Sequence, residues 1–323
     1  MKIIRAKHSG FCFGVKRAIQ KTLESIENNE NNSGNIFTCG QLIHNASVTD
    51  ELARKGVNII PSPDEAGIND TIIVRSHGEP KAFYKAAEKN GVKIVDATCP
   101  FVSKIHQLVS DAHNQGKNII IVGDKNHPEV IGINGWCDNT ACIFNSSKDA
   151  ETFNKDSAFL VSQTTLKKET LEEVIAALTK EGVILEVQNT ICNATHQRQK
   201  SAADLAEKVD AMIVIGGRNS SNTQKLYEIC KKKQNNCFFI EDIGDLPLKE
   251  LEKYNTIGIA AGASTPERVI KEVISTMSEN ITNENISMAD IMDEIDASYK
   301  SVYGEIRSAW SRKDGRFEWD ITI

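Results

Sequence analysis

Three short stretches, each a cysteine followed at once by an amphipathic helical pattern, recur about once per third of the chain. They are Phe11-Cys12-Phe13-Gly14, Ala97-Thr98-Cys99-Pro100 and Ile191-Cys192-Asn193-Ala194, and the intervals between their cysteines are 87 and 93 residues. A recurrence at this period indicates a chain built from similar supersecondary units. The sequence therefore predicts three related parts, each presenting one thiol at the start of a helix.

Short apolar, β-branched runs alternate with helical patterns through most of the 323 residues. Runs of this kind are typical of parallel strands that are buried on both faces. The expected strands are 3–6, 36–39, 71–76, 93–98, 118–124, 158–163, 183–187, 211–217, 237–240 and 256–261. Their alternation with helices predicts an α/β fold with mainly parallel sheets.

The repeated order of strand, polar loop and helix divides the chain into domains, as its length also leads us to expect. Three α/β units are predicted, at 1–98 with Cys12, 99–190 with Cys99 and Glu129, and 191–282 with Cys192. Their ligand loops are expected at the carboxyl ends of strands, where open α/β sheets bind ligands.

Residues 283–323 lie outside the repeat and are expected to form an appended peripheral element. A helix is predicted over 288–298, and 306–310 with 316–323 predicts a hairpin around Lys313-Asp314-Gly315. The final segment faintly resembles the C-terminal hairpin of bacterial rhamnosidases, a match too short to support a function.

Bulk properties exclude some partners and favour a cytoplasmic location. A net charge of −6 and a pI near 5.7 argue against a general nucleic-acid or anionic membrane surface. The sequence has no apolar run of the roughly 20 residues needed to cross a bilayer, and its start is charged too soon for a signal peptide. We therefore read its eight cysteines as thiols or metal ligands before disulfides.

The three recurring cysteines are the strongest candidates for a metal centre. A thiolate at a helix N-terminus is stabilised by the helix dipole and by free backbone N–H groups. Three of them converging on a pseudo-threefold axis suit an iron–sulfur cluster or zinc; the lack of a Cys-x-x-Cys pair argues against structural zinc. The alternative is that all three are buried apolar cysteines at tight turns.

The other five cysteines are interpreted as core thiols, which is the common state of a free cysteine. They are Cys39, Cys137, Cys142, Cys230 and Cys237. The spacing of Cys137 and Cys142 is a weak indication of a metal or redox pair.

Polar loops that follow predicted strands supply candidates for holding a phosphate. Three of the seven histidines lie in such loops, and glycine-flanked hydroxyl and amide groups precede two of the helices. The candidates are His44, His77, His127, Ser220, Ser221, Asn222 and Ser264. The alternative is that the histidines are solvated and the Ser and Asn residues are ordinary helix N-caps.

Glu129, in His127-Pro128-Glu129, is a candidate general acid. A carboxyl in a closed pocket near anionic groups has its pKa raised toward neutrality. Thr164, at a strand end, could pass a proton or hold a substrate hydroxyl. The alternative for Glu129 is a surface residue that matches the dipole of the helix it opens.

Several of these stretches together resemble the LytB family of 4-hydroxy-3-methylbut-2-enyl diphosphate reductases, in order over about residues 1–278. The resemblance is carried by Phe11-Cys12-Phe13-Gly14-Val15, Arg75-Ser76-His77-Gly78, Asp96-Ala97-Thr98-Cys99-Pro100-Phe101-Val102, Asn126-His127-Pro128-Glu129, Ser162-Gln163-Thr164-Thr165, Ile191-Cys192-Asn193-Ala194-Thr195, Asn219-Ser220-Ser221-Asn222-Thr223 and Gly262-Ala263-Ser264. The tail is the one departure from the family pattern.

The resemblance implies a trefoil of three α/β domains around one 4Fe–4S cluster, held by Cys12, Cys99 and Cys192 with one iron open. It implies the last step of the methylerythritol phosphate route to isoprenoids, a two-electron, two-proton removal of a hydroxyl group as water that yields isopentenyl and dimethylallyl diphosphates. The implied catalytic residues are Glu129, Thr164 and His127. The implied substrate-binding residues are His44, His77, His127, Thr164, Ser220, Ser221, Asn222 and Ser264. A ferredoxin or flavodoxin is the expected electron donor.

Two other functions fit parts of the pattern. A zinc-dependent phosphohydrolase would use Cys and His ligands with Glu129 as base, and it would be colourless. An iron–sulfur redox sensor or cluster carrier would keep the cysteines, but it has no need of three histidines and the Ser-Ser-Asn loop.

Overall fold

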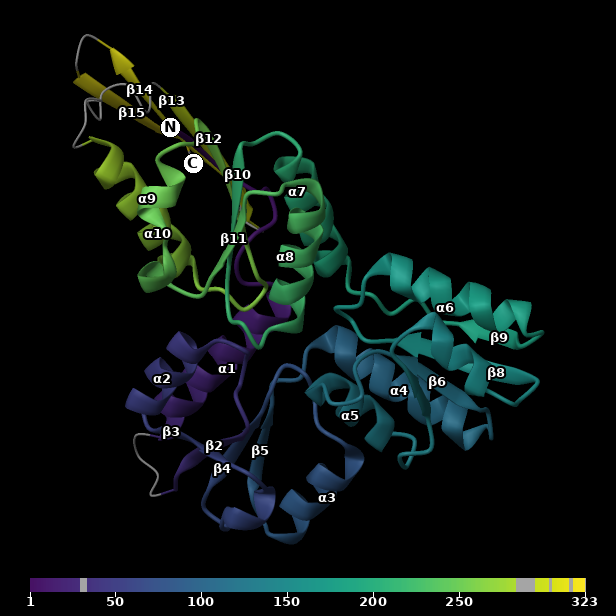
Figure 1. The fold of residues 1–323 in the computed structure, drawn as a ribbon. Helices are drawn as coiled ribbons and strands as arrows, with labels where there is room; N and C mark the ends of the chain where they lie inside the picture. Colours follow the sequence, from purple (N-terminus) through teal and green to yellow (C-terminus); the bar gives the residue numbers. More distant parts are fainter. Residues whose placement is uncertain (30–33, 283–293, 302–303, 314–315, 323) are drawn as a thin grey trace. The chain divides into compact units, whose positions relative to one another are not determined.

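A computed structural model of the chain describes residues 1–29, 34–282, 294–301, 304–313 and 316–322. It divides into two compact units, Met1–Ile270 and Lys271–Ile323. The first unit contains three separate four-stranded sheets, and every strand pairing within them is parallel (Figure 1). The predicted α/β class is therefore confirmed.

The three sheets share one strand order. The first is β3 (Val57–Ile60), β2 (Ile36–Cys39), β4 (Thr71–Val74) and β5 (Lys93–Asp96). The second is β7 (Cys142–Phe144), β6 (Ile119–Val122), β8 (Ser157–Ser162) and β9 (Ile184–Val187). The third, read in the same direction, is β11 (Cys237–Ile240), β10 (Ala211–Ile215), β12 (Thr256–Ala261) and β1 (Lys2–Arg5).

Helices connect the strands, as parallel pairing requires. They are α1 (Phe13–Asn29), α2 (Ala46–Arg54), α3 (Lys81–Lys89), α4 (Pro100–Asn114), α5 (Pro128–Gly135), α6 (Lys168–Lys180), α7 (Asn193–Ala206), α8 (Ser221–Lys233), the short α9 (Leu248–Leu251) and α10 (Glu267–Thr282). Among the described residues, 3₁₀ turns lie at Pro63–Glu65, Ser147–Thr152 and Ile243–Asp245. None of the helices in the described part of the chain is long and apolar enough to cross a membrane.

The first strand of the chain completes the last sheet. β1 pairs with β12 in the register Lys2 to Thr256 through Arg5 to Ile259. It therefore occupies the place that β5 and β9 occupy in the other sheets. The predicted unit 1–98 is corrected in this respect, because its first strand belongs to the sheet of the third unit. The other proposed boundaries stay a prediction.

Apolar residues on the two faces of each strand enter different cores. In the second sheet, Ile120 and Leu160 pack with α6, whereas Ile121 and Val161 pack with α4 and α5. All of these side chains are fully buried. This explains the continuous apolar runs of the central strands, since a strand covered on both faces has no polar side.

In the first unit the sequence missed two strands, β3 and β7, and both are edge strands. The burial of β3 is confined to its two ends, and β7 has only three residues, beginning with the exposed Cys142. Neither carries the long apolar run of a central strand. The exposure of Cys142 also makes its interpretation as a core thiol wrong; the other four are buried.

The second unit contains an antiparallel sheet in the order β13 (Glu294–Ser301), β14 (Gly304–Lys313) and β15 (Arg316–Thr322). The predicted hairpin is confirmed by the pairing of β14 with β15. The predicted helix over 288–298 is wrong from residue 294 onward, and residues 288–293 lie outside the described part. Ile295, Ala297 and Tyr299 alternate with polar residues, which is the period of a strand.

We expect the replacement Ile213→Ala to lower the free energy of unfolding by about 2–5 kcal/mol, because it leaves a cavity in the centre of the third sheet. Ile213 is fully buried in β10. The matched control is Ile184→Ala in the edge strand β9, where the side chain is 73% exposed; this change should cost less than about 1 kcal/mol. Urea unfolding of both variants measures the difference, and equal costs would contradict the assigned burial.

Candidate functional site

One pocket in the first unit brings together all twelve residues predicted to form a site. They are Cys12, Cys99, Cys192, His44, His77, His127, Glu129, Thr164, Ser220, Ser221, Asn222 and Ser264. All three sheets contribute loops to this pocket. The structure thus supports the predicted convergence, while the role of each residue stays a prediction.

Each cysteine lies where the chain crosses from one sheet to the next domain. It follows an edge strand of one sheet and opens a helix that packs on the following sheet; α1, for example, packs through Val15 and Ala18 against Ile36 and Ile73. The amide of each cysteine donates to the carbonyl two residues beyond the neighbouring strand. These bonds are Cys12 N to Ala263 O at 3.1 Å, Cys99 N to Ser76 O at 3.0 Å and Cys192 N to Thr164 O at 2.9 Å.

The backbone at Gly14 packs closely against two of the thiols. A Cβ atom built on it would be 2.7 Å from the Cys99 Sγ atom and 3.9 Å from that of Cys12. A side chain at this position would therefore crowd the sulfur atoms. The equivalent residues after the other cysteines, Phe101 and Ala194, also line the pocket.

The separation of the sulfur atoms argues against a single ion held by all three cysteines. Among the described residues, the three histidines form a group compact enough to hold one ion, and the three cysteines do not. Two thiolates on one zinc ion are at most about 4.6 Å apart, since each Zn–S bond is about 2.3 Å. A polynuclear cluster, which spreads its thiolate ligands over several metal atoms, fits this donor set better.

Burial and the N-terminus of α4 have opposite effects on the pKa of the Cys99 thiol. Burial raises its pKa to about 11, while the backbone N–H groups of Phe101 and Val102 oppose the rise. The nearby thiols of Cys12 and Cys192 contribute to this rise. The N–H groups favour a thiolate once a metal displaces the proton.

The three histidines form a close cluster on the polar side of the pocket. The ring centroid of His44 lies 4.6 Å from that of His77 and 5.7 Å from that of His127. Burial lowers the pKa of all three, to about 4 for His127. The rings are therefore neutral near pH 7, and Nε2 of His44 and Nδ1 of His77 are buried without a hydrogen-bond partner. Such atoms point to a polar ligand.

The same histidines could also ligate a metal ion. One ring nitrogen from each lies within 4.8 Å of the others, and a neutral imidazole is a good metal ligand. The geometry alone therefore leaves both an anion and a divalent ion as occupants of the histidine cluster.

The Ser-Ser-Asn loop opens helix α8. Ser220 is its N-cap and accepts a bond from Thr223 N at 3.4 Å, so the predicted capping role is present. Asn222 is buried, and both its side-chain oxygen and nitrogen lack partners. Ser264 donates to the His44 carbonyl at 3.1 Å, which ties the last loop to the histidine cluster.

Glu129 is buried, and each of its two carboxylate oxygens contacts Thr164. Thr164 N donates to Oε1 at 2.6 Å, and the Thr164 hydroxyl lies 2.7 Å from Oε2. Burial raises the pKa of Glu129, although the two bonds from Thr164 partly offset it. The alternative of an exposed surface glutamate is wrong, because Glu129 is only 2% exposed.

Two cationic residues of the site were missed by the sequence reasoning. Arg198 lines the pocket from α7. Lys225 donates to the Ser221 hydroxyl at 3.1 Å and opposes the rise in the Glu129 pKa. A signal existed for Lys225, which follows Ser221 by one helical turn. Arg198 lies six residues after Cys192 without any local motif of its own.

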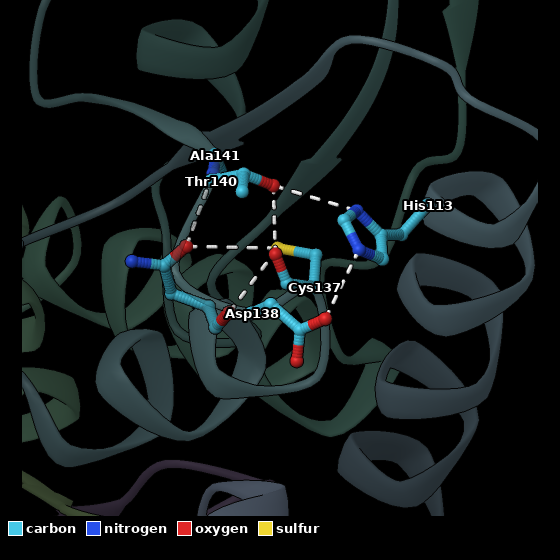
Figure 2. A network of polar contacts seen from close by, with 6 residues as sticks. His113, Cys137, Asp138, Thr140 and Ala141 are labelled. Atoms are coloured by element: carbon cyan, nitrogen blue, oxygen red, sulfur yellow. Dashed lines mark hydrogen bonds and ion pairs between the residues drawn. The ribbon is translucent and has the colours of Figure 1, made fainter.

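The Cys137 region forms a second polar network, outside this pocket (Figure 2). The Cys137 thiol donates to Asn134 O at 3.2 Å, while His113 contacts Asp138 and the Thr140 hydroxyl at 3.3 and 3.4 Å. The thiol and the imidazole thus engage different partners, and burial raises the thiol pKa. The network stabilises the turn after α5, so Cys137 is a structural thiol.

The chain belongs to the LytB protein family. The sequence model of the family described as LytB protein matches residues 3–278, which is most of the chain and nearly all of the first unit. The matched range holds all three cysteines of the pocket and every other residue predicted for the site.

Similar curated proteins carry one common name. The 4-hydroxy-3-methylbut-2-enyl diphosphate reductase of Thermoanaerobacter sp. strain X514 is 46% identical over 277 residues, which are 85% of this chain and 96% of that protein. The Clostridioides difficile protein of the same name is 45% identical over 87% of this chain and all of that protein.

Two solved structures are also similar. The structure described as (E)-4-hydroxy-3-methyl-but-2-enyl diphosphate reductase, the terminal enzyme of the non-mevalonate pathway, is 39% identical with a TM-score of 0.65 and covers 86% of this chain and all of its own. The E-1-hydroxy-2-methyl-but-2-enyl-4-diphosphate reductase of Plasmodium falciparum is 27% identical with a TM-score of 0.80, over 85% and 87%.

The tail has two different matches. The model described as the bacterial alpha-L-rhamnosidase C-terminal domain matches residues 285–323, too small a part of the chain to assign a family. The reductase of Clostridium tetani is 45% identical over 316 residues, which are 97% of this chain and 49% of that longer protein. The alignment to a reductase therefore extends into the tail.

We expect pyrophosphate to bind this chain with proton uptake, because an anion beside neutral imidazoles raises their lowered pKa values. Its affinity should accordingly rise as the pH falls from about 8 to about 6. Calorimetric titration of the wild type and of His77→Gln separates this effect from the ionisation of pyrophosphate itself. His113→Gln, outside the pocket, is the control. Equal pH dependence in the wild type and His77→Gln would contradict an anion at the histidine cluster.

Proposed function

We propose that this chain reduces 4-hydroxy-3-methylbut-2-enyl diphosphate to isopentenyl and dimethylallyl diphosphates on a 4Fe–4S cluster. The reductase function is that of the family, whose curated members are 45–47% identical over at least 85% of this chain. The observation that carries the proposal is the convergence of three crossover cysteines and three neutral histidines on one pocket.

Cys12, Cys99 and Cys192 would hold the cluster, one from each crossing between domains. Two observations support a polynuclear group: Gly14 lets the backbone approach two of the thiols closely, and the three cysteines are not a described ligand group compact enough for one ion. Three protein thiolates leave one iron of a 4Fe–4S cluster without a protein ligand. When bound, the cluster would supply electrons and a Lewis-acidic iron for the substrate hydroxyl.

The histidine cluster, the Ser-Ser-Asn loop and Ser264 would hold the diphosphate. Neutral imidazoles, hydroxyls and an amide can donate to phosphate oxygens and need little charge of their own. The unpartnered atoms of His44, His77 and Asn222 support this role, because a bound anion would complete their hydrogen bonds. Lys225 adds a positive charge behind Ser221, so the site is not built from neutral donors alone.

Glu129 and Thr164 would deliver the proton that the leaving hydroxyl needs. The Oε1 atom of Glu129 is occupied by the Thr164 N–H, so the proton of the neutral carboxyl belongs on Oε2. In the structure the Thr164 hydroxyl donates to Oε2 at 2.7 Å. With Oε2 protonated, the direction of this bond would reverse, and the Thr164 hydroxyl would donate into the pocket. Removal of the substrate hydroxyl as water consumes two electrons and two protons; a ferredoxin or flavodoxin as the electron source stays a prediction.

The Cys12→Ser, Cys99→Ser and Cys192→Ser variants should each lose most of the bound iron and nearly all turnover, since each removes one of three ligands. Iron, sulfide and turnover are measured on anaerobically reconstituted protein. Cys230→Ser is the matched control, because Cys230 is equally a free cysteine but lies in the core of the third domain. It should retain iron, and loss of the cluster in this variant would show that the assigned ligands are wrong.

Glu129→Gln should lower kcat by about 10²–10⁴-fold while KM changes little, since the amide keeps the volume but cannot supply a proton. In the wild type, turnover should fall as pH rises through the raised pKa of Glu129, because only the protonated carboxyl is active. Glu172→Gln, on the exposed face of α6, is the control. Near-wild-type turnover in Glu129→Gln would remove Glu129 from this role.

A further inference from the structure

Arg198 places a buried positive charge beside the cysteines. The residue is 7% exposed and lines the pocket. Within the part of the chain that the structure describes, it forms no salt bridge with a carboxylate. The negative groups that act on its guanidinium are the thiols of Cys12 and Cys192 in their ionised form. A buried charge without a counter-charge is costly, so its presence calls for an explanation.

The guanidinium joins the first turn of α7, which Cys192 caps, to the loop that carries Cys12. Its Nη2 atom donates to Gly10 O at 2.8 Å, and its Nη1 atom donates to Ala194 O at 2.9 Å. Gly10 lies two residues before Cys12, and Ala194 lies two residues after Cys192. The bond to Gly10 spans 188 residues of sequence. The Nε atom of Arg198 is buried and has no partner.

The internal repeat shows that packing alone does not require an arginine here. The residue six positions after each cysteine is buried in all three domains: it is Ala18 after Cys12, Ile105 after Cys99 and Arg198 after Cys192. In the other two domains an apolar side chain fills this place. The third domain therefore has a charged side chain at a position where the other two domains have an apolar one.

We propose that Arg198 is a positioning residue that fixes the Cys12 loop relative to the Cys192 end of α7 and offsets the negative charge of a thiolate-bound cluster. The inference rests on the cluster of the proposed function. A cluster that gains an electron becomes more negative, so a fixed cation nearby stabilises the reduced form. Net charge and hydrogen bonding around a cluster are among the factors that set its reduction potential.

The test compares Arg198→Gln and Arg198→Lys by redox titration of the reconstituted cluster, followed by electron paramagnetic resonance. Arg198→Gln removes the charge and should shift the one-electron reduction equilibrium at least about tenfold toward the oxidised form, which is about 59 mV. Arg198→Lys keeps the charge but loses the fork that reaches both carbonyls. It should stay within about threefold of the wild type while releasing iron faster to a chelator.

Ile105→Met is the matched control at the equivalent position of the second domain. It should leave both the reduction equilibrium and the rate of iron release unchanged. A wild-type potential in Arg198→Gln would overturn the electrostatic role, and a wild-type rate of iron release in Arg198→Lys would overturn the bridging role.

If Arg198→Gln does not fold, Arg198→Lys decides the electrostatic role: a tenfold shift despite the retained charge would overturn it, and a shift within threefold supports it. Failure of the wild-type chain to bind iron would refute the proposed function itself, and the two failures are therefore distinguishable.

Discussion

The hydrogen bond from each cysteine amide to the loop after the neighbouring strand is the interaction on which the site depends. In every domain this bond places a thiol next to a polar loop of the pocket. Cys99 lies beside the loop of His77, Cys192 beside Thr164, and Cys12 beside Ser264. Because each cysteine also opens the helix of the next domain, the crossings between domains become the proposed metal-binding positions. The thiols and the polar loops are thus placed by one set of backbone bonds.

The same arrangement explains the division of the pocket into two sides. Near the cysteines, residues that follow them by two or three positions, such as Val15 and Val102, form an apolar wall. On the other side, burial keeps the histidines neutral and raises the pKa of Glu129. Desolvation therefore keeps the imidazoles available as neutral donors for an anion and favours the protonated form of the Glu129 carboxyl. The proposed removal of a hydroxyl group from a diphosphate substrate needs both.

Local sequence was sufficient for the central strands of the first unit and for the site motifs. The central strands can be recognised from their continuous apolar runs. The cysteines and histidines of the pocket lie next to the ends of predicted strands. The place of β1 could not be predicted in this way, because the four residues Lys2–Arg5 pair with β12 about 250 residues later, and no local pattern encodes such a partner. The same limit applies to Arg198, whose bond to Gly10 exists only once the first and third parts of the chain meet.

The central claim is that the three crossover cysteines hold a cluster and not a zinc ion. Metal and sulfide analysis of the anaerobically purified protein, with its visible absorbance, tests it most directly. We predict about four iron and four sulfide per chain, a broad absorbance near about 400 nm and no stoichiometric zinc. A colourless protein with one zinc per chain and no iron would contradict the account and favour a metal-dependent hydrolase.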